Sequence, residues 1–121
     1  MGWQKYNTEK GRIGESRVCD YLKRNGYSIL ERNFRVPGSE LDIIALDKAC
    51  TTLVCIEVKR WSRPYYPEDD IRYAVSPRKI HRLKRGLASF IASNRQLRYD
   101  FIRIDVILLY GGELIHIEGE P

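Results

Sequence analysis

The length, composition and charge of this sequence exclude several classes of protein. Its 121 residues, 43% of them hydrophobic and 31% charged, fit one folded domain over residues 1–121, and no apolar run approaches the roughly 20 residues that span a membrane. The 21 Lys and Arg against 16 Asp and Glu give a net charge of +5, which favours a polyanionic partner, and a charged start without an apolar stretch predicts a cytoplasmic protein.

The first half of the chain predicts one helix followed by three strands. Apolar residues recur at helical spacing before Gly26, which predicts a helix over residues 9–25. Three β-rich stretches follow, over residues 27–34, 40–46 and 53–59. The turn sequence Pro37-Gly38-Ser39 separates the first two, and a short polar break typical of an antiparallel hairpin separates the last two.

The second half predicts a loop, a second helix and two strands. Residues 61–76 carry prolines and no clear period, so we expect a mobile loop there. Ser76 followed by Pro77 is typical of a helix start, and an apolar stripe continues to near Asn94. Strands over residues 99–109 and 113–117 complete the order αβββαββ. That order predicts an α/β fold in which helices flank a mixed sheet.

Metal or disulfide chemistry based on cysteine and histidine is not expected. The three cysteines, Cys19, Cys50 and Cys55, include no CxxC pair, and the histidines, His81 and His116, are isolated in the sequence. We therefore expect neither a disulfide scaffold nor a zinc site, and we interpret both histidines as surface or half-buried side chains.

Positive charge is concentrated between Pro77 and Arg103, where Asp100 is the only acid. The basic residues of this stretch are Arg78, Lys79, Arg82, Lys84, Arg85, Arg95, Arg98 and Arg103. The second helix therefore offers a surface suited to a polyanion, and the alternative is an ordinary solvated helix face.

Two carboxylates converge in the expected hairpin. Asp42 and Glu57 lie symmetrically about its turn, so simple antiparallel register sets them opposite each other. Facing carboxylates repel, so we expect a cation nearby: Lys59 could supply part of the charge, and Mg²⁺ or Mn²⁺ suits oxygen ligands. Glu15, on the helix face that should pack on the sheet, adds a third acid. The alternative is an ion-pair network without a chemical role.

These residues carry a resemblance to known nucleases. Asp42 followed by Glu57-Val58-Lys59 resembles the D…ExK signature of the PD-(D/E)XK, or restriction-endonuclease-like, superfamily. Most of the chain resembles the YraN family of small bacterial nuclease-like proteins, which is similar to archaeal Holliday-junction resolvases. The matching segments are Gly11 to Glu15, Tyr21-Leu22, Gly26-Tyr27, Arg32 to Arg35, Gly38 to Ala45, Ile56 to Lys59, Val75 with Lys79, and Arg103 to Ile107.

The resemblance implies a restriction-endonuclease-like core and metal-dependent hydrolysis of phosphodiester bonds in nucleic acid, with DNA, including branched DNA, as the expected partner. It implies that Glu15, Asp42 and Glu57 bind Mg²⁺ or Mn²⁺ and that Lys59 is the catalytic lysine. The side chains expected to contact phosphate groups are Lys79, Arg82, Arg85 and Arg35.

The sequence departs from the family pattern at two places. Ser39 replaces a second glycine, and Arg60-Trp61 replaces a small residue and an arginine after the lysine. The alternative function is that of a nucleic-acid-binding accessory protein with the same fold and no cleavage. Junction resolvases act as dimers, so the resemblance also suggests a homodimer; the sequence leaves the oligomeric state, and the choice between DNA and RNA, open.

Overall fold

Two helices and five strands make up the part of the chain that the computed structural model describes, residues 9–61 and 75–119. In chain order they are α1 (Glu9–Arg24), β1 (Tyr27–Val36), β2 (Ser39–Asp47), β3 (Thr52–Arg60), α3 (Pro77–Ala92), β4 (Phe101–Tyr110) and β5 (Glu113–Ile117). The predicted order αβββαββ is confirmed. Most of the loop expected over residues 61–76 lies outside the described residues.

The strands form one mixed sheet in the order β1-β2-β3-β4-β5. Neighbouring strands are antiparallel except β3 and β4, which run parallel. A parallel pair needs a crossover between its strands, and α3 lies in that connection. The α/β class and the mixed sheet flanked by helices are therefore as predicted. In the described residues, none of the helices is both long enough and apolar enough to cross a membrane.

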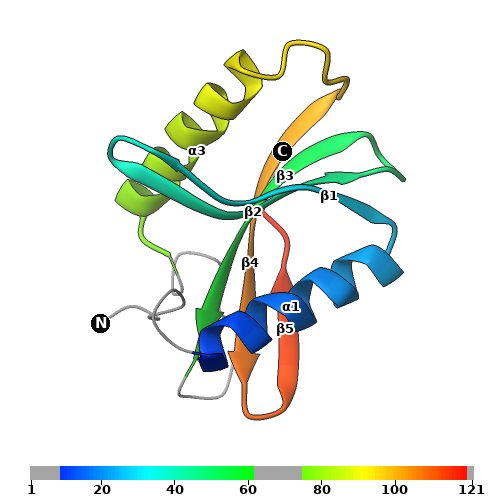
Figure 1. Ribbon diagram of the computed structural model, residues 1–121, viewed down its shortest axis with the longest axis vertical. Coiled ribbons are helices and arrows are strands. Elements are labelled where there is room, and N and C mark those ends of the chain that lie inside the picture. The colour runs from blue at the N-terminus through cyan, green and yellow to red at the C-terminus, as the bar shows by residue number, and fades with distance from the viewer. Residues whose placement is uncertain (1–8, 62–74, 120–121) are drawn as a thin grey trace.

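The two helices pack on opposite faces of this sheet (Figure 1). The cluster on the α1 face includes Val18, Leu22, Ile43, Ala45, Val54, Ile56, Val58 and Ile107. The cluster on the α3 face includes Leu41, Ile44, Leu53, Cys55, Leu83, Leu87, Phe90 and Val106. Because side chains alternate along a strand, Glu57 and Lys59 share with Cys55 the face of β3 that looks toward α3.

The helix ends follow the local signals in the sequence. The Ser76 hydroxyl accepts a hydrogen bond from the backbone N–H of Lys79 at 3.1 Å, and Pro77 occupies the first turn of α3, as the sequence predicts. After α1, Gly26 has a φ of 88°, a left-handed conformation that glycine adopts without steric cost. These caps fix where α3 begins and where α1 ends.

The hairpin of β1 and β2 lies against α3. The hydroxyl of Ser39, directly after the Pro37-Gly38 turn, donates a hydrogen bond to the backbone carbonyl of Arg82 at 2.9 Å. Gly86 of α3 permits this close approach, because a Cβ atom there would lie 2.4 Å from Leu41 Cδ1 and 2.7 Å from Ser39 Oγ. The lack of a side chain at Gly86 therefore sets the spacing between the hairpin and the helix.

Replacing Gly86 by alanine is expected to destabilise the protein by about 1–3 kcal/mol, because the added methyl group overpacks a contact with the fully buried Leu41. Urea denaturation measures the free energy of unfolding. Helix propensity gives no reason for a loss of stability, because alanine favours a helix more than glycine does. The same helix already carries an alanine at the exposed position 88. An unfolding free energy equal to that of the parent would contradict the close approach described above.

Candidate metal and nucleic-acid site

Strands β2 and β3 separate at Asp42. Their backbone ladder runs from Asp47–Thr52 to Ile43–Ile56 and ends there, and beyond it the β1–β2 hairpin turns away from β3 (Figure 1). One residue past the ladder, Asp42 Oδ2 accepts a hydrogen bond from the backbone N–H of Val58 at 2.8 Å. The fully buried Asp42 carboxylate therefore lies at the fork between the strands, next to the Glu57–Val58 peptide.

Glu57 lies at the same fork and meets a cation from α3. Its side chain is only 6% exposed, and the Lys79 ammonium nitrogen lies 3.6 Å from Glu57 Oε2. Within the described residues Glu57 Oε1 is buried with no hydrogen-bond partner. From the sequence we expect a cation beside the two carboxylates, with Lys59 as one candidate. In the structure, Lys79 forms the ion pair with Glu57. Lys59 is half-buried on the same strand face.

Glu15 is buried on α1 and is bound to β1. Its Oε1 atom lies 3.5 Å from Arg32 Nη2 and accepts a long hydrogen bond, 3.4 Å, from Asn33 Nδ2. On β1, Asn33 comes between the residues that pair with Ile43 and Leu41, which places it beside Asp42. The Glu15 carboxylate thus reaches the strand position next to Asp42, and its role as a metal ligand stays a prediction.

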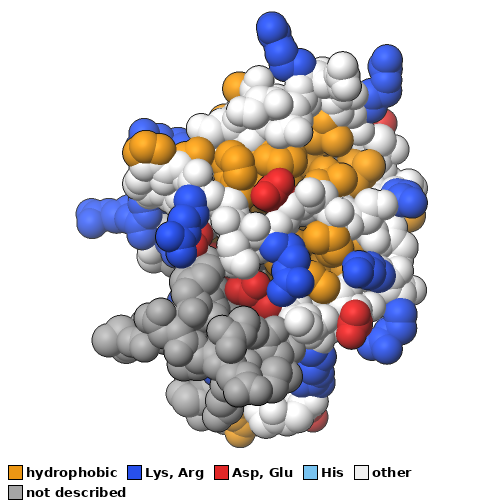
Figure 2. Space-filling model, viewed as in Figure 1, with side chains coloured by type: hydrophobic (Ala, Val, Ile, Leu, Met, Phe, Trp, Pro, Cys, Tyr) orange, Lys and Arg blue, Asp and Glu red, His pale blue; other side chains and the backbone are white. Residues whose placement is uncertain are grey.

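Basic side chains line a groove between the hairpin and α3. A cavity of about 480 Å³ is bordered by Arg35, Ser39, Glu40, Lys79 and Arg82, and a smaller one of about 100 Å³, along the same helix, by Arg82 and Arg85. Figure 2 shows Lys and Arg side chains projecting around this hairpin and the start of α3. All four predicted phosphate-contacting residues therefore lie on one surface, where Arg35 also pairs with Glu40 at 2.7 Å.

The residues at the fork are better suited to Mg²⁺, which keeps water and substrate ligands, than to an ion whose ligands all come from the protein. In the described parts of the chain, no group of three or more His, Cys, Asp or Glu side chains is arranged to hold a metal. Mg²⁺ is often held by one or two carboxylates, with substrate phosphates and water completing its shell. Asp42 and Glu57 supply two such groups, and the buried Glu57 Oε1, which has no hydrogen-bond partner among the described residues, is a carboxylate oxygen available to a cation.

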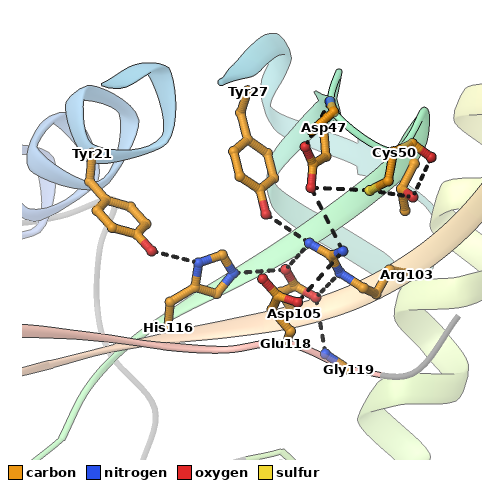
Figure 3. Close-up of polar contacts among 11 residues, drawn as sticks. Tyr21, Tyr27, Asp47, Cys50, Arg103, Asp105, His116, Glu118 and Gly119 are labelled. Atoms are coloured by element: carbon orange, nitrogen blue, oxygen red, sulfur yellow. Dashed lines mark hydrogen bonds and ion pairs between the residues drawn. The ribbon is translucent and has the colours of Figure 1, made fainter. Parts of the chain in front are cut away.

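A second buried polar cluster, which was not predicted from the sequence, lies on the α1 face of β4 (Figure 3). Asp105 accepts hydrogen bonds from Arg103 Nε at 2.8 Å and from His116 Nε2 at 2.7 Å. His116 Nδ1 in turn meets the Tyr21 hydroxyl at 2.9 Å, and Arg103 Nη2 donates to the Tyr27 hydroxyl at 2.7 Å. The network therefore ties β4 and β5 to α1 and to the start of β1.

One interpretation from the sequence is corrected by this network, and another is confirmed. Arg103, counted there with the basic residues that favour a polyanion, is only 7% exposed and is committed to Asp105. His116, interpreted from the sequence as a surface or half-buried side chain, is half-buried, and both of its ring nitrogens make hydrogen bonds. The signal in the sequence was the pair Arg103 and Asp105, two charges on one face of an otherwise apolar strand.

The ionisation of the buried groups follows from these contacts. Burial raises the pKa of Tyr27 to about 12, and burial likewise raises the pKa of Tyr21. For Asp105, burial acts to raise the pKa, but the hydrogen bonds from His116, Arg103 and the Gly119 N–H together lower it below the usual value. Burial also raises the pKa of the Cys19 thiol, which keeps it protonated.

Comparisons with known proteins place the chain in a family. A UPF0102 protein of Mycobacterium avium is 40% identical over 114 residues, covering 90% of this chain and 87% of the relative. A UPF0102 protein of Trichlorobacter lovleyi is 39% identical over 120 residues, covering 97% of this chain and 91% of the relative. The model of "Uncharacterised protein family UPF0102", known also as YraN, matches residues 14–109. The chain belongs to the UPF0102 family.

Proposed function

We propose that this protein is a divalent-metal-dependent endonuclease that hydrolyses phosphodiester bonds in DNA. The observation that carries the proposal is the fork between β2 and β3, where the buried Asp42 carboxylate is bound to the backbone next to Glu57 and Glu57 pairs with Lys79 of a basic groove. The order of helices and strands, together with the Asp42…Glu57-Val58-Lys59 spacing, resembles the PD-(D/E)XK superfamily and supports the same reaction.

In this proposal each side chain at the fork has a role that follows from its position. Asp42 and Glu57 would hold Mg²⁺ or Mn²⁺, and Glu15 would support them from α1. The bound ion would supply Lewis-acid polarisation of the phosphodiester and activation of water. Lys59, on the same strand face as Glu57, orients the attacking water and offsets the negative charge that develops on the phosphate oxygens. A two-carboxylate site leaves positions for substrate phosphate oxygens.

The groove gives the substrate a place to bind. Arg35, Lys79 and Arg82 line it, and Arg85 continues the basic surface along α3. Contacts of this kind position a nucleic-acid backbone and carry no base information, so the proposed activity does not depend on a particular base sequence. Structure-dependent cleavage, for example at branches, is the form of selectivity that agrees with the resemblance to junction resolvases.

The test is a cleavage assay on a panel of linear duplex, single-stranded and branched DNA with Mg²⁺ or Mn²⁺. The proposal expects products in the presence of the ion, none with a chelator, and none with the Glu57→Gln variant. A protein that binds the panel but cleaves no member of it would instead be the non-catalytic accessory protein. RNA of matched sequence, included in the same panel, distinguishes DNA from RNA as substrate.

Binding of DNA is expected to depend on Arg82 and Arg85. Replacing both by alanine should weaken binding of every duplex tested. It should also lower the salt dependence of log K by roughly 0.9 for each phosphate group that the variant no longer neutralises. Fluorescence anisotropy at several salt concentrations measures both quantities.

The matched control for this prediction replaces Arg95 and Arg98, which lie after α3 and do not line the groove. That double variant loses the same net charge, so we expect it to retain more of the affinity and more of the salt dependence. Equal losses of affinity in the two double variants would show that binding depends on overall charge and not on the groove.

A further inference from the structure

Lys79 takes part in both features of the candidate site. Its ammonium group lies 3.6 Å from Glu57 Oε2 at the fork, and the same side chain lines the groove with Arg35 and Arg82. The Lys79 side chain is 35% exposed, whereas that of Glu57 is 6% exposed. Lys79 is thus a partly solvated cation that faces a buried carboxylate on one side and the groove on the other.

The contact between Lys79 and Glu57 is loose enough to be exchanged. A separation of 3.6 Å is longer than a hydrogen bond between an ammonium group and a carboxylate, so the attraction is mainly electrostatic. Water partly screens it because Lys79 is more than a third exposed. The other carboxylate oxygen, Glu57 Oε1, has no hydrogen-bond partner in the described part of the chain. Among the described residues, the buried Glu57 carboxylate is therefore neutralised only in part, by the distant Lys79 ammonium.

A divalent ion and the Lys79 ammonium compete for this carboxylate. An ion bound to Glu57 repels Lys79, so the lysine lowers the affinity of the protein for metal as long as it stays at the fork. A phosphate group in the groove attracts the same ammonium and draws it away from Glu57. Each ligand then favours the binding of the other, which is the thermodynamic definition of positive coupling.

We propose that Lys79 is a positioning residue that couples occupation of the groove by DNA phosphate to release of Glu57 for the divalent ion. The inference rests on the proposed function, because it assigns the groove to nucleic acid and the fork to metal. Its consequence is that the protein binds Mn²⁺ weakly by itself and more tightly with DNA. Lys79 would thereby keep the ion from binding productively before the substrate arrives.

The first measurement is the affinity for Mn²⁺ without nucleic acid, by isothermal titration calorimetry. We expect Lys79→Ala to bind Mn²⁺ about fivefold to tenfold more tightly than the parent, within the usual range of coupling between sites. The control, Arg82→Ala, removes an equal charge from the same groove but no ion pair with Glu57, and we expect its affinity to stay within about twofold of the parent because exposed charges are screened. Lys79→Gln keeps most of the side-chain stem and checks that packing is not responsible.

The second measurement is the affinity for a phosphorothioate duplex that resists cleavage, with and without Mn²⁺ at matched ionic strength. We expect Mn²⁺ to tighten binding to the parent and to Arg82→Ala by the same factor, and to tighten binding to Lys79→Ala by a clearly smaller factor. Unchanged Mn²⁺ affinity and an unchanged factor in Lys79→Ala would overturn the coupling while leaving the proposed function intact. A parent protein that binds neither Mn²⁺ nor the duplex would overturn both.

Discussion

Replacing Glu57 by glutamine is expected to abolish metal-dependent cleavage without lowering the stability of the metal-free protein. The proposed metal interaction contributes several kcal/mol to the transition state, so the loss of rate should be about 100-fold or more. The stability of the metal-free protein should not fall with the rate. Glutamine keeps the shape of the side chain and removes a buried negative charge whose ion pair with Lys79 is long. The Lys79 ammonium left behind is partly exposed and can be hydrated by water.

Thermal unfolding with and without Mn²⁺ measures the second half of this prediction. The ion should stabilise the parent, by about 2.7 kcal/mol at 100 times its Kd, because it binds the folded state preferentially. It should leave Glu57→Gln almost unaffected. Glu31→Gln, a change of the same type at an exposed position of β1, is the control that should keep both cleavage and the response to Mn²⁺.

The opposite pattern would identify a structural ion pair. If Glu57 serves only to hold Lys79, the glutamine variant is less stable than the parent without metal, and neither protein responds to Mn²⁺. Together with an absence of cleavage in the parent, that result would remove the nuclease proposal and leave the fold and the family.

The elements of this fold could be predicted because their signals are local. Ser76-Pro77 and Gly26 mark helix ends through backbone hydrogen bonding and allowed φ angles, and the Pro37-Gly38 turn sets the register of β1 and β2. The position of Asp42 close to Glu57 could be predicted by counting residues on either side of the turn between β2 and β3. Each of these depends on residues close together in the sequence.

The contacts that could not be predicted from the sequence join elements that are far apart in the chain. The ion pair of Lys79 with Glu57 depends on how α3 is placed over β3, and strand alternation by itself favoured Lys59, two residues from Glu57. Arg103 illustrates the same limit, because its charge counts as surface charge until β4 is known to lie inside the sheet, between β3 and β5. Gly86 also gives no sequence signal for its contact with Leu41.

The largest loss of stability is expected when Asp105 is replaced by alanine. Asp105 is fully buried and accepts hydrogen bonds from Arg103, His116 and the backbone N–H of Gly119. Its removal leaves the buried Arg103 guanidinium without its closest carboxylate, and losing one partner of a buried pair typically costs about 3–5 kcal/mol. That is a large part of the roughly 5–15 kcal/mol by which a protein is stable. Urea denaturation should measure it.

A second variant separates the charge of Asp105 from the rest of the network. His116→Ala removes the contact with Tyr21 and one donor to Asp105 but leaves the ion pair with Arg103 in place. We expect a smaller loss of about 1–3 kcal/mol, the cost of leaving a buried polar group without its partner. Equal losses in the two variants would mean that Arg103 and Asp105 contribute little beyond packing.

The pH dependence of stability gives an independent check on the same carboxylate. Because the pKa of Asp105 is lower in the folded protein than in the unfolded chain, its ionised form favours folding. That contribution is fully present above the unfolded-state value of about 3.9, and it is lost as the pH falls through the lower folded-state value. The unfolding free energies of the parent and of Asp105→Asn should therefore differ by a constant amount near neutral pH and converge in strong acid. A difference that stays constant down to the acid transition would show that Asp105 contributes by shape and not by charge.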